Sequence, residues 1–166
     1  MDQAEGAIEA ARAAGAERYA PNELASATNA LQLAHDAVAQ RDYRLALNHA
    51  LESREQAQNA ARQAADTHAR VRGEAERSMA EVAALLAQAE AHLAAAESAR
   101  VPRRVLTEAR TALETARTDV QEAREAMNEE DYAVAQPALD GLKTRIEAAI
   151  ATLDEAMSTQ SSRRRG

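Results

Sequence analysis

The sequence predicts an all-α fold, an elongated antiparallel helical bundle or coiled coil. Two observations predict it. An apolar stripe with coiled-coil spacing occurs twice along the chain, and about a quarter of the 166 residues are alanine, the best helix former. Aromatic residues make up 2% of the chain. Since each missing methylene forfeits about 0.8 kcal/mol of burial free energy, we expect well-formed helices around a thin core.

The apolar stripe recurs with the same residue types at the same 3-4-3-4 spacing, 82 positions later. The first copy is Leu24, Ala27, Leu31, Ala34 and Val38, and the second is Leu106, Ala109, Leu113, Ala116 and Val120. Further along, Asp42-Tyr43 recurs as Asp131-Tyr132, 89 positions later. The distance grows by seven residues, one heptad, and a heptad leaves such a stripe in phase. The chain therefore contains a duplicated helical unit.

Proline, glycine and aspartate place the first three expected helices. A frayed helix over residues 1–18 is weakened by Gly6 and Gly15, each by about 1 kcal/mol. Pro21 opens a second helix that ends near Gln40, because proline suits the first helical turn. Asp42 is the expected N-cap of the third helix, since its carboxylate accepts from free backbone N–H groups.

The third helix is expected to be long and to be shared by both units. Residues 43–100 contain no proline and a single glycine, Gly73, where we expect a bend. Pro102 then opens the next helix, which ends near Asn128. Tyr132 opens the last helix, in which Pro137 predicts either a kink or a helix that starts at Pro137 itself.

These signals predict two similar three-helix units, residues 1–72 and 73–158, and a disordered tail over residues 159–166. The units differ in the size of their apolar residues. The second has Leu139, Leu142, Ile146 and Leu153 where the first has Ala50, Ser53, Ala57 and Ala64. We therefore expect the second unit to be the more stable and residues 1–70 to exchange amide hydrogens first.

Motifs for catalysis or for metal and cofactor binding are not found. The histidines (His35, His49, His68 and His92) lack the Glu-x-x-His spacing of di-iron bundles, and there is no cysteine ligand. A thin bundle without a glycine-rich loop offers little enclosure for a catalytic site. We expect no enzyme activity, no cofactor and no metal, and we interpret the histidines as surface residues.

The recurring corners provide the candidate interaction residues. They are Tyr19, Pro21, Asp42, Tyr43, Asp131 and Tyr132. The simpler interpretation is that each tyrosine opens or closes a helix and packs its ring against a neighbouring helix, with the hydroxyl in water. We treat these residues as helix corners that are also candidates for contact with a partner.

The charge and hydropathy pattern limits the partners. A net charge of −7 argues against nucleic acid, which requires a basic face. No apolar run approaches the ~18 residues that span a bilayer, so we expect no direct membrane insertion, and the N-terminal residues do not resemble a secretion signal. A protein partner or self-association remains open.

Two segments resemble a known bacterial family. Residues 16–24, with the corner Tyr-Ala-Pro-x-Glu-Leu, and residues 41–46, with Asp-Tyr-x-x-Ala, are similar to the domain of unknown function DUF4398. The resemblance covers residues 4–66 and, more faintly, 86–157. It implies an envelope setting in Gram-negative bacteria, often as lipoproteins and sometimes with an OmpA-like peptidoglycan-binding domain. This chain departs from that pattern in lacking a signal peptide, a lipobox cysteine and an OmpA-like domain.

By this resemblance we expect the protein in the periplasm or at the outer membrane, near peptidoglycan, and otherwise in the cytoplasm. The leading hypothesis is a non-enzymatic helical spacer or interaction scaffold of the cell envelope. The alternative is a repeat-type helical binding module whose inter-helix groove accepts a peptide or a glycan. A concave surface lined by Tyr43 or Tyr132 would favour the module.

Overall fold

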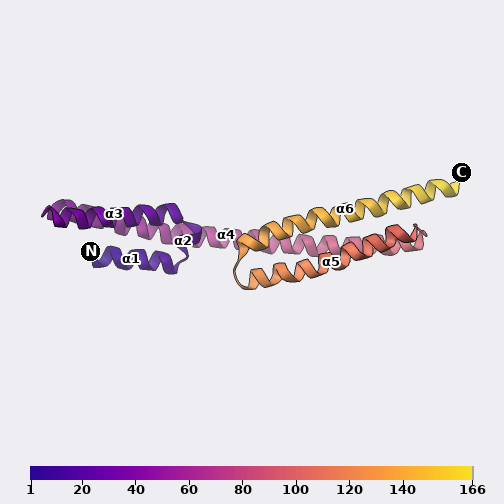
Figure 1. The fold of residues 1–166 in the computed structure, drawn as a ribbon, viewed down its shortest axis with the longest axis horizontal. Helices are drawn as coiled ribbons and strands as arrows, with labels where there is room; N and C mark the ends of the chain where they lie inside the picture. Colours follow the sequence, from indigo (N-terminus) through magenta and orange to yellow (C-terminus); the bar gives the residue numbers. More distant parts are fainter. Residues whose placement is uncertain (166) are drawn as a thin grey trace. The chain divides into compact units, whose positions relative to one another are not determined.

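The computed structural model describes residues 1–165, and all regular structure in that range is helical, with no strand. The helices are α1 (Asp2–Ala13), α2 (Ala16–Tyr19), α3 (Pro21–Ala39), α4 (Tyr43–Ser98), α5 (Arg103–Asn128) and α6 (Tyr132–Arg165). The prediction of an all-α bundle is confirmed. The chain forms two compact units, Met1–Val71 and Arg72–Gly166. In the first, α1, α2 and α3 lie along the first part of α4, and in the second, α5 and α6 lie along its remainder (Figure 1).

The first unit begins with two short helices rather than the single helix predicted over residues 1–18. Gly15 separates α1 from α2 with a φ of +81°, a left-handed conformation that glycine adopts without steric cost. The Gly15 N–H still donates to the Arg12 carbonyl at 2.8 Å. Pro21 begins α3 as predicted, and the Leu24 N–H donates to the Ala20 carbonyl at 3.1 Å.

Helices α3, α4 and α5 end in the same way. The second residue after each helix has a positive φ, namely Arg41 (62°), Arg100 (60°) and Glu130 (58°). The next N–H then reaches back five residues, from Asp42 to Ala37 at 2.9 Å, from Val101 to Ala96 at 3.1 Å and from Asp131 to Ala126 at 2.8 Å. These bonds satisfy carbonyls that the helix end would otherwise leave free. The duplicated corners of the sequence are therefore duplicated in three dimensions.

The core of the first unit is built almost entirely of alanine. Its buried cluster contains Ile8, Ala11, Ala16, Ala20, Leu24, Ala27, Ala57, Ala60 and Ala64. Ser53 is fully buried beside them, and its hydroxyl donates to the Ala27 carbonyl at 2.8 Å. Small side chains allow the helices to approach closely, but each buries little apolar surface.

The core of the second unit contains larger side chains. One buried cluster contains Val82, Ala89, Leu113, Ala116, Val120, Ala123, Leu139, Leu142, Ile146 and Ile150. A second, smaller cluster contains Ala96, Val101, Ala109 and Leu153. The copy of the sequence with larger apolar residues therefore has the thicker core, as predicted.

Two details of the helix boundaries differ from the expectations. Helix α4 is continuous through Gly73, and the bend expected there stays a prediction. Helix α6 begins at Tyr132, so the suggested start at Pro137 is wrong. Pro137 lies in the second turn of α6, where it cannot supply the N–H that the Ala133 carbonyl would otherwise accept. The predicted disordered tail, residues 159–166, is helical as far as Arg165, and Gly166 lies outside the described residues.

None of the helices in the described residues has both the length and the apolar character required to cross a membrane.

Candidate interaction surface

Tyr19 and Pro21 form a packed corner in the first unit. The Tyr19 ring meets the His68 ring of α4 edge to face, with centroids 5.1 Å apart, and the Arg18 guanidinium lies 5.8 Å from its centroid. A Cβ atom at Gly15 would lie 3.3 Å from a Tyr19 ring carbon. The half-buried ring therefore fixes α2 against α4, and Pro21 opens α3 directly after it. Both residues act in the structure as helix-corner residues.

Asp42 is the N-cap of α4, as predicted. Its Oδ1 atom accepts from the Leu45 N–H at 3.0 Å, and its carbonyl accepts from the Ala46 N–H at 2.9 Å. The next residue, Tyr43, was expected to pack its ring on the preceding helix. Instead it is 67% exposed. No helix of the first unit covers the ring.

The equivalent corner of the second unit places its tyrosine differently. The Asp131 carbonyl accepts from the Val134 and Ala135 N–H groups at 3.1 and 3.0 Å, so it occupies the same cap position as Asp42. Tyr132, however, is only 6% exposed. The recurrence of Asp-Tyr therefore preserves the corner but not the environment of the ring.

Most of the large exposed apolar side chains of the described residues belong to one segment, the end of the α3–α4 hairpin. We name this surface the apolar tip, and it consists of Leu33, Val38, Tyr43, Leu45, Leu47 and Leu51. In the second unit the corresponding group contains only Val134. These side chains lie on more than one helix face, since Leu45 and Leu47 are two residues apart on α4, and those that share a face are candidates for contact with a partner. The sequence contains a signal for the apolar tip that the sequence analysis missed. Leu45, Leu47 and Leu51 do not share the helical spacing of the buried residues Ala46, Ser53 and Ala57.

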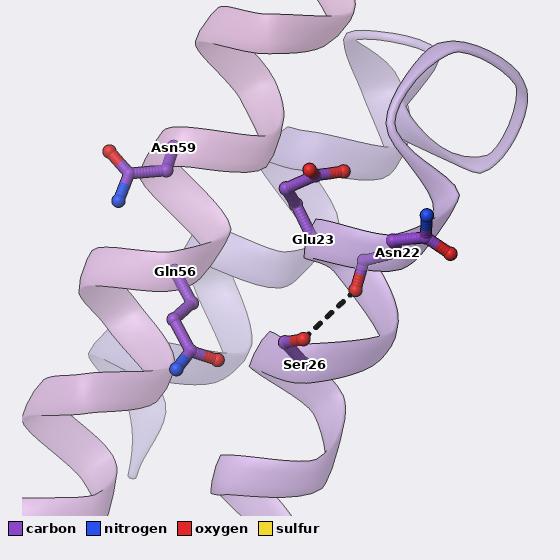
Figure 2. A pocket seen from close by; sticks show the side chains of 5 residues that line it. All are labelled: Asn22, Glu23, Ser26, Gln56 and Asn59. Atoms are coloured by element: carbon purple, nitrogen blue, oxygen red, sulfur yellow. Dashed lines mark hydrogen bonds between the residues drawn. The ribbon is translucent and has the colours of Figure 1, made fainter.

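The surface grooves of the structure lie between pairs of helices. One, of about 260 Å³, lies between α3 and α4 and is lined by Asn22, Glu23, Ser26, Gln56 and Asn59. Figure 2 shows the amides of Asn22 and Asn59 turned away from each other and the Ser26 hydroxyl bonded to the Asn22 carbonyl. Such side chains do not converge on a single point. Neither Tyr43 nor Tyr132 lines this groove.

The histidines are dispersed and have separate partners. His35 lies 3.5 Å from Glu5, His49 lies 3.4 Å from Glu52, and His92 lies 2.6 Å from Asp154. Within residues 1–165, no group of three histidine, aspartate or glutamate side chains is arranged to hold a metal ion.

The second unit has an ion pair between α4 and α6. The Lys143 ammonium donates to the Glu81 carboxylate. This hydrogen bond, with the attraction of the two charges, lowers the pKa of Glu81 below its usual 4.5 and raises the pKa of Lys143 above its usual 10.5. At the duplicate position of the first unit, Arg54 donates instead to the neutral amide oxygen of Gln3 at 2.8 Å.

The fold and the surface define the chain as an all-α protein of duplicated helical units with an exposed apolar end on the first of them. A comparison with protein families identifies the segment that contains this end. Residues 1–75 match the family described as a domain of unknown function, DUF4398, and the resemblance seen in the sequence is confirmed there. No curated protein and no solved structure is significantly similar to the chain.

Proposed function

We propose that the protein is a non-enzymatic helical scaffold that works by helix-to-helix contact with other protein surfaces. The observation that carries this proposal is the apolar tip. Leu47 is 59% exposed and Tyr43 is 67% exposed, so most of the surface of both side chains is in water in the isolated chain. Burying these two side chains against another helix would contribute favourable burial free energy, of which the alanine core of the first unit provides little.

The proposed setting is the bacterial cell envelope, near peptidoglycan. Its support is the similarity of residues 1–75 to DUF4398, together with the envelope role that the resemblance implies. Fractionation of cells that express the intact gene from its own start tests the location. Recovery in the periplasmic or outer-membrane fraction is expected, and recovery in the cytoplasm would refute it.

Photo-cross-linking in living cells tests the scaffold role. A photoreactive amino acid replaces Leu47 in one variant and Thr118, an exposed polar residue of α5, in the matched control. We expect discrete protein adducts, identified by mass spectrometry, from position 47 and few from position 118. Equal labelling at both positions, or no adduct at position 47, would contradict a role for the apolar tip.

A second candidate function, binding of a peptide or glycan, is favoured by one observation. The Gln56 Oε1 atom is buried without a hydrogen-bond partner, and the amide lies on the side of α4 that faces α3 (Figure 2). A ligand hydroxyl or N–H would satisfy it. Titration with peptidoglycan fragments, monitored by NMR shifts of the Gln56 side-chain amide, tests this function. A response that Gln56→Ala abolishes would support it, and unchanged spectra would exclude it for these ligands.

A further inference from the structure

Two arginines begin α5, at a place where helix stability favours acidic residues. Arg103 and Arg104 occupy its first turn, which contains no acidic residue. The positive end of the helix dipole lies there and disfavours cations. At the duplicate positions of the first unit, α3 has Pro21 and Asn22, and Glu23 follows in the same turn. The two arginines therefore do not stabilise the helix that they begin.

The segment around this turn is basic in a chain that is acidic as a whole. Residues 100–110 contain four arginines and one glutamate, whereas the whole chain carries a net charge of −7. Salt bridges engage two of these arginines. Arg104 pairs with Glu108 at 2.8 Å, and Arg110 pairs with Glu97 at 2.7 Å. The other two arginines of the segment give it a local positive charge that nothing nearby neutralises in the described residues.

Three guanidinium groups in this part of the second unit are free for a ligand. They belong to Arg100 after α4, Arg103 at the start of α5 and Arg163 near the end of α6, and all three are exposed. Within the part of the chain that the structure describes, none of the three side chains forms a salt bridge or a hydrogen bond. A guanidinium group binds a carboxylate through two parallel hydrogen bonds.

A groove of about 290 Å³ lies between the start of α5 and the C-terminal part of α6. Its apolar lining comes from Pro102, Val105 and Ala156, and its polar lining includes Gln160 and Arg163. Val105 and Ala156 also pack against the smaller buried cluster of the second unit. The core of the unit therefore fixes the apolar part of the groove.

The groove and the free arginines form one surface, which we name the basic groove. It consists of the groove lining together with Arg100 and Arg103, which flank Pro102 in the sequence. Gln160 is half-buried in the lining and forms no hydrogen bond with the described residues, so its amide can bond a peptide group. Such a surface suits a ligand that carries carboxylates, apolar side chains and peptide groups together.

The surroundings of the basic groove favour a peptide over a wider anionic surface. Glu155 is part of the groove lining, and its neighbour Asp154 pairs with His92 of α4. A bilayer or a nucleic acid presents negative charge over an area far larger than the groove and would also meet these acidic side chains. A short segment interacts only within the Debye length of about 8 Å. It can place its carboxylates at the arginines and leave Glu155 in water.

We infer that the basic groove binds an acidic, partly apolar peptide segment of another protein. The inference rests on the proposed scaffold role and gives the class of partner for the second unit. Carboxylates of the segment bind Arg103 and Arg163, and its apolar side chains contact Val105 and Ala156. The scaffold then has two different surfaces, an apolar one on the first unit and a basic one on the second.

Fluorescence anisotropy of a labelled peptide with the full chain tests the inference. The probe is a soluble peptide of repeated Glu-Ser-Leu-Gly, and its neutral counterpart has glutamine in place of glutamate. We expect saturable binding of the acidic peptide, weakened by added salt, and little binding of the neutral one. The double variant Arg103→Gln/Arg163→Gln should raise the Kd roughly tenfold, because two exposed ion pairs are lost.

A second double variant, Arg44→Gln/Arg124→Gln, is the matched control. It removes the same charge from two exposed arginines that have no salt bridge in the described residues and lie outside the groove lining. It should leave the Kd unchanged. Arg103→Gln alone should leave the thermal midpoint unchanged or raise it, since the start of a helix disfavours cations, whereas a structural role would lower the midpoint.

The inference would be overturned if binding were not saturable, if both double variants weakened it equally, or if the neutral peptide bound as well as the acidic one. Tighter binding to vesicles that contain phosphatidylglycerol than to the peptide would overturn it in favour of a lipid surface. All these outcomes leave the cross-linking test at position 47 unaffected. Conversely, peptide binding without adducts at position 47 would refute the apolar tip and leave the basic groove standing.

Discussion

Ser53 and Leu142 occupy the same position in the two copies of one helical unit, and the difference between them summarises how the copies diverge. Both side chains are buried. Ser53 fills its place by donating to the Ala27 carbonyl at 2.8 Å, whereas Leu142 packs in the main apolar cluster of its unit. The first unit thus joins two helices by a polar bond where the second uses apolar volume.

The comparison shows that helix formation and core formation are separate properties of this chain. Both units have the same stripe spacing and an aspartate at the cap position of the helix. Both also have a residue with a left-handed backbone conformation at the corner. Alanine propensity and caps are sufficient to form helices in either copy. Full burial of a leucine or isoleucine contributes about 1.5–3 kcal/mol, and the second unit has several such residues that the first lacks. We therefore expect stability to follow the core and not the corners.

The largest expected effect comes from removing core volume in the second unit. Leu142→Ala should lower the free energy of unfolding of that unit by about 2–5 kcal/mol, because it leaves a cavity among packed side chains. Chemical denaturation of the full chain, followed by circular dichroism, measures the loss. Leu33→Ala in the first unit is the control, since Leu33 is 50% exposed and should change stability by at most about 0.5 kcal/mol. Equal losses of stability for Leu142→Ala and Leu33→Ala would show that the core of the second unit contributes no more than an exposed leucine.

Adding volume at the equivalent position of the first unit should also destabilise. Ser53→Leu introduces a larger side chain between closely packed alanines and removes the hydrogen bond to Ala27, at a cost of about 1–3 kcal/mol. Ser53→Ala removes only the bond and should cost about 1 kcal/mol. Thermal unfolding of both variants measures the two effects. A stabilising Ser53→Leu would show that the first unit has space for the core of the second.

Hydrogen exchange compares the two units within a single molecule. Amides of α3 should exchange at least tenfold faster than those of α5 and α6, a difference of about 1.4 kcal/mol in opening free energy. Mass spectrometry of peptides from a native-state exchange experiment resolves the helices. Slower exchange in α3 than in α5 would show that the alanine core is not the weaker one.

The sequence predicted the helices, the duplication and the relative size of the two cores, because each depends on local residue type and spacing. It also predicted the cap at Asp42, which a side chain makes to its own helix. It did not predict the different exposures of Tyr43 and Tyr132, because burial depends on contacts between helices and not on the residue types at the corner. It also missed the break at Gly15, where a single backbone conformation divides a continuous helical pattern.

A smaller effect should be the same in both units. Arg41 and Glu130 hold a left-handed φ of 62° and 58°, and glycine adopts this conformation without the Cβ cost. Arg41→Gly and Glu130→Gly should each stabilise the chain by about 0.5–1 kcal/mol, measured by thermal unfolding. Gly15→Ala is the opposite control and should destabilise, because its φ is +81° and its Cβ would meet the Tyr19 ring. A gain at only one corner would show that the corners differ after all.

The smallest expected effect depends on pH and belongs to the second unit. The folded pKa of Glu81 lies below its usual 4.5 because Lys143 bonds and attracts its charged form. The stability that this pair contributes is therefore present above the unfolded pKa and is lost as the pH falls through the folded pKa. Lys143→Met should flatten the stability profile of the second unit between about pH 5 and about pH 3, measured by unfolding midpoints. Arg54→Met is the matched control, since Arg54 bonds the neutral Gln3; if it flattens the profile equally, the pH dependence does not come from the Glu81 pair.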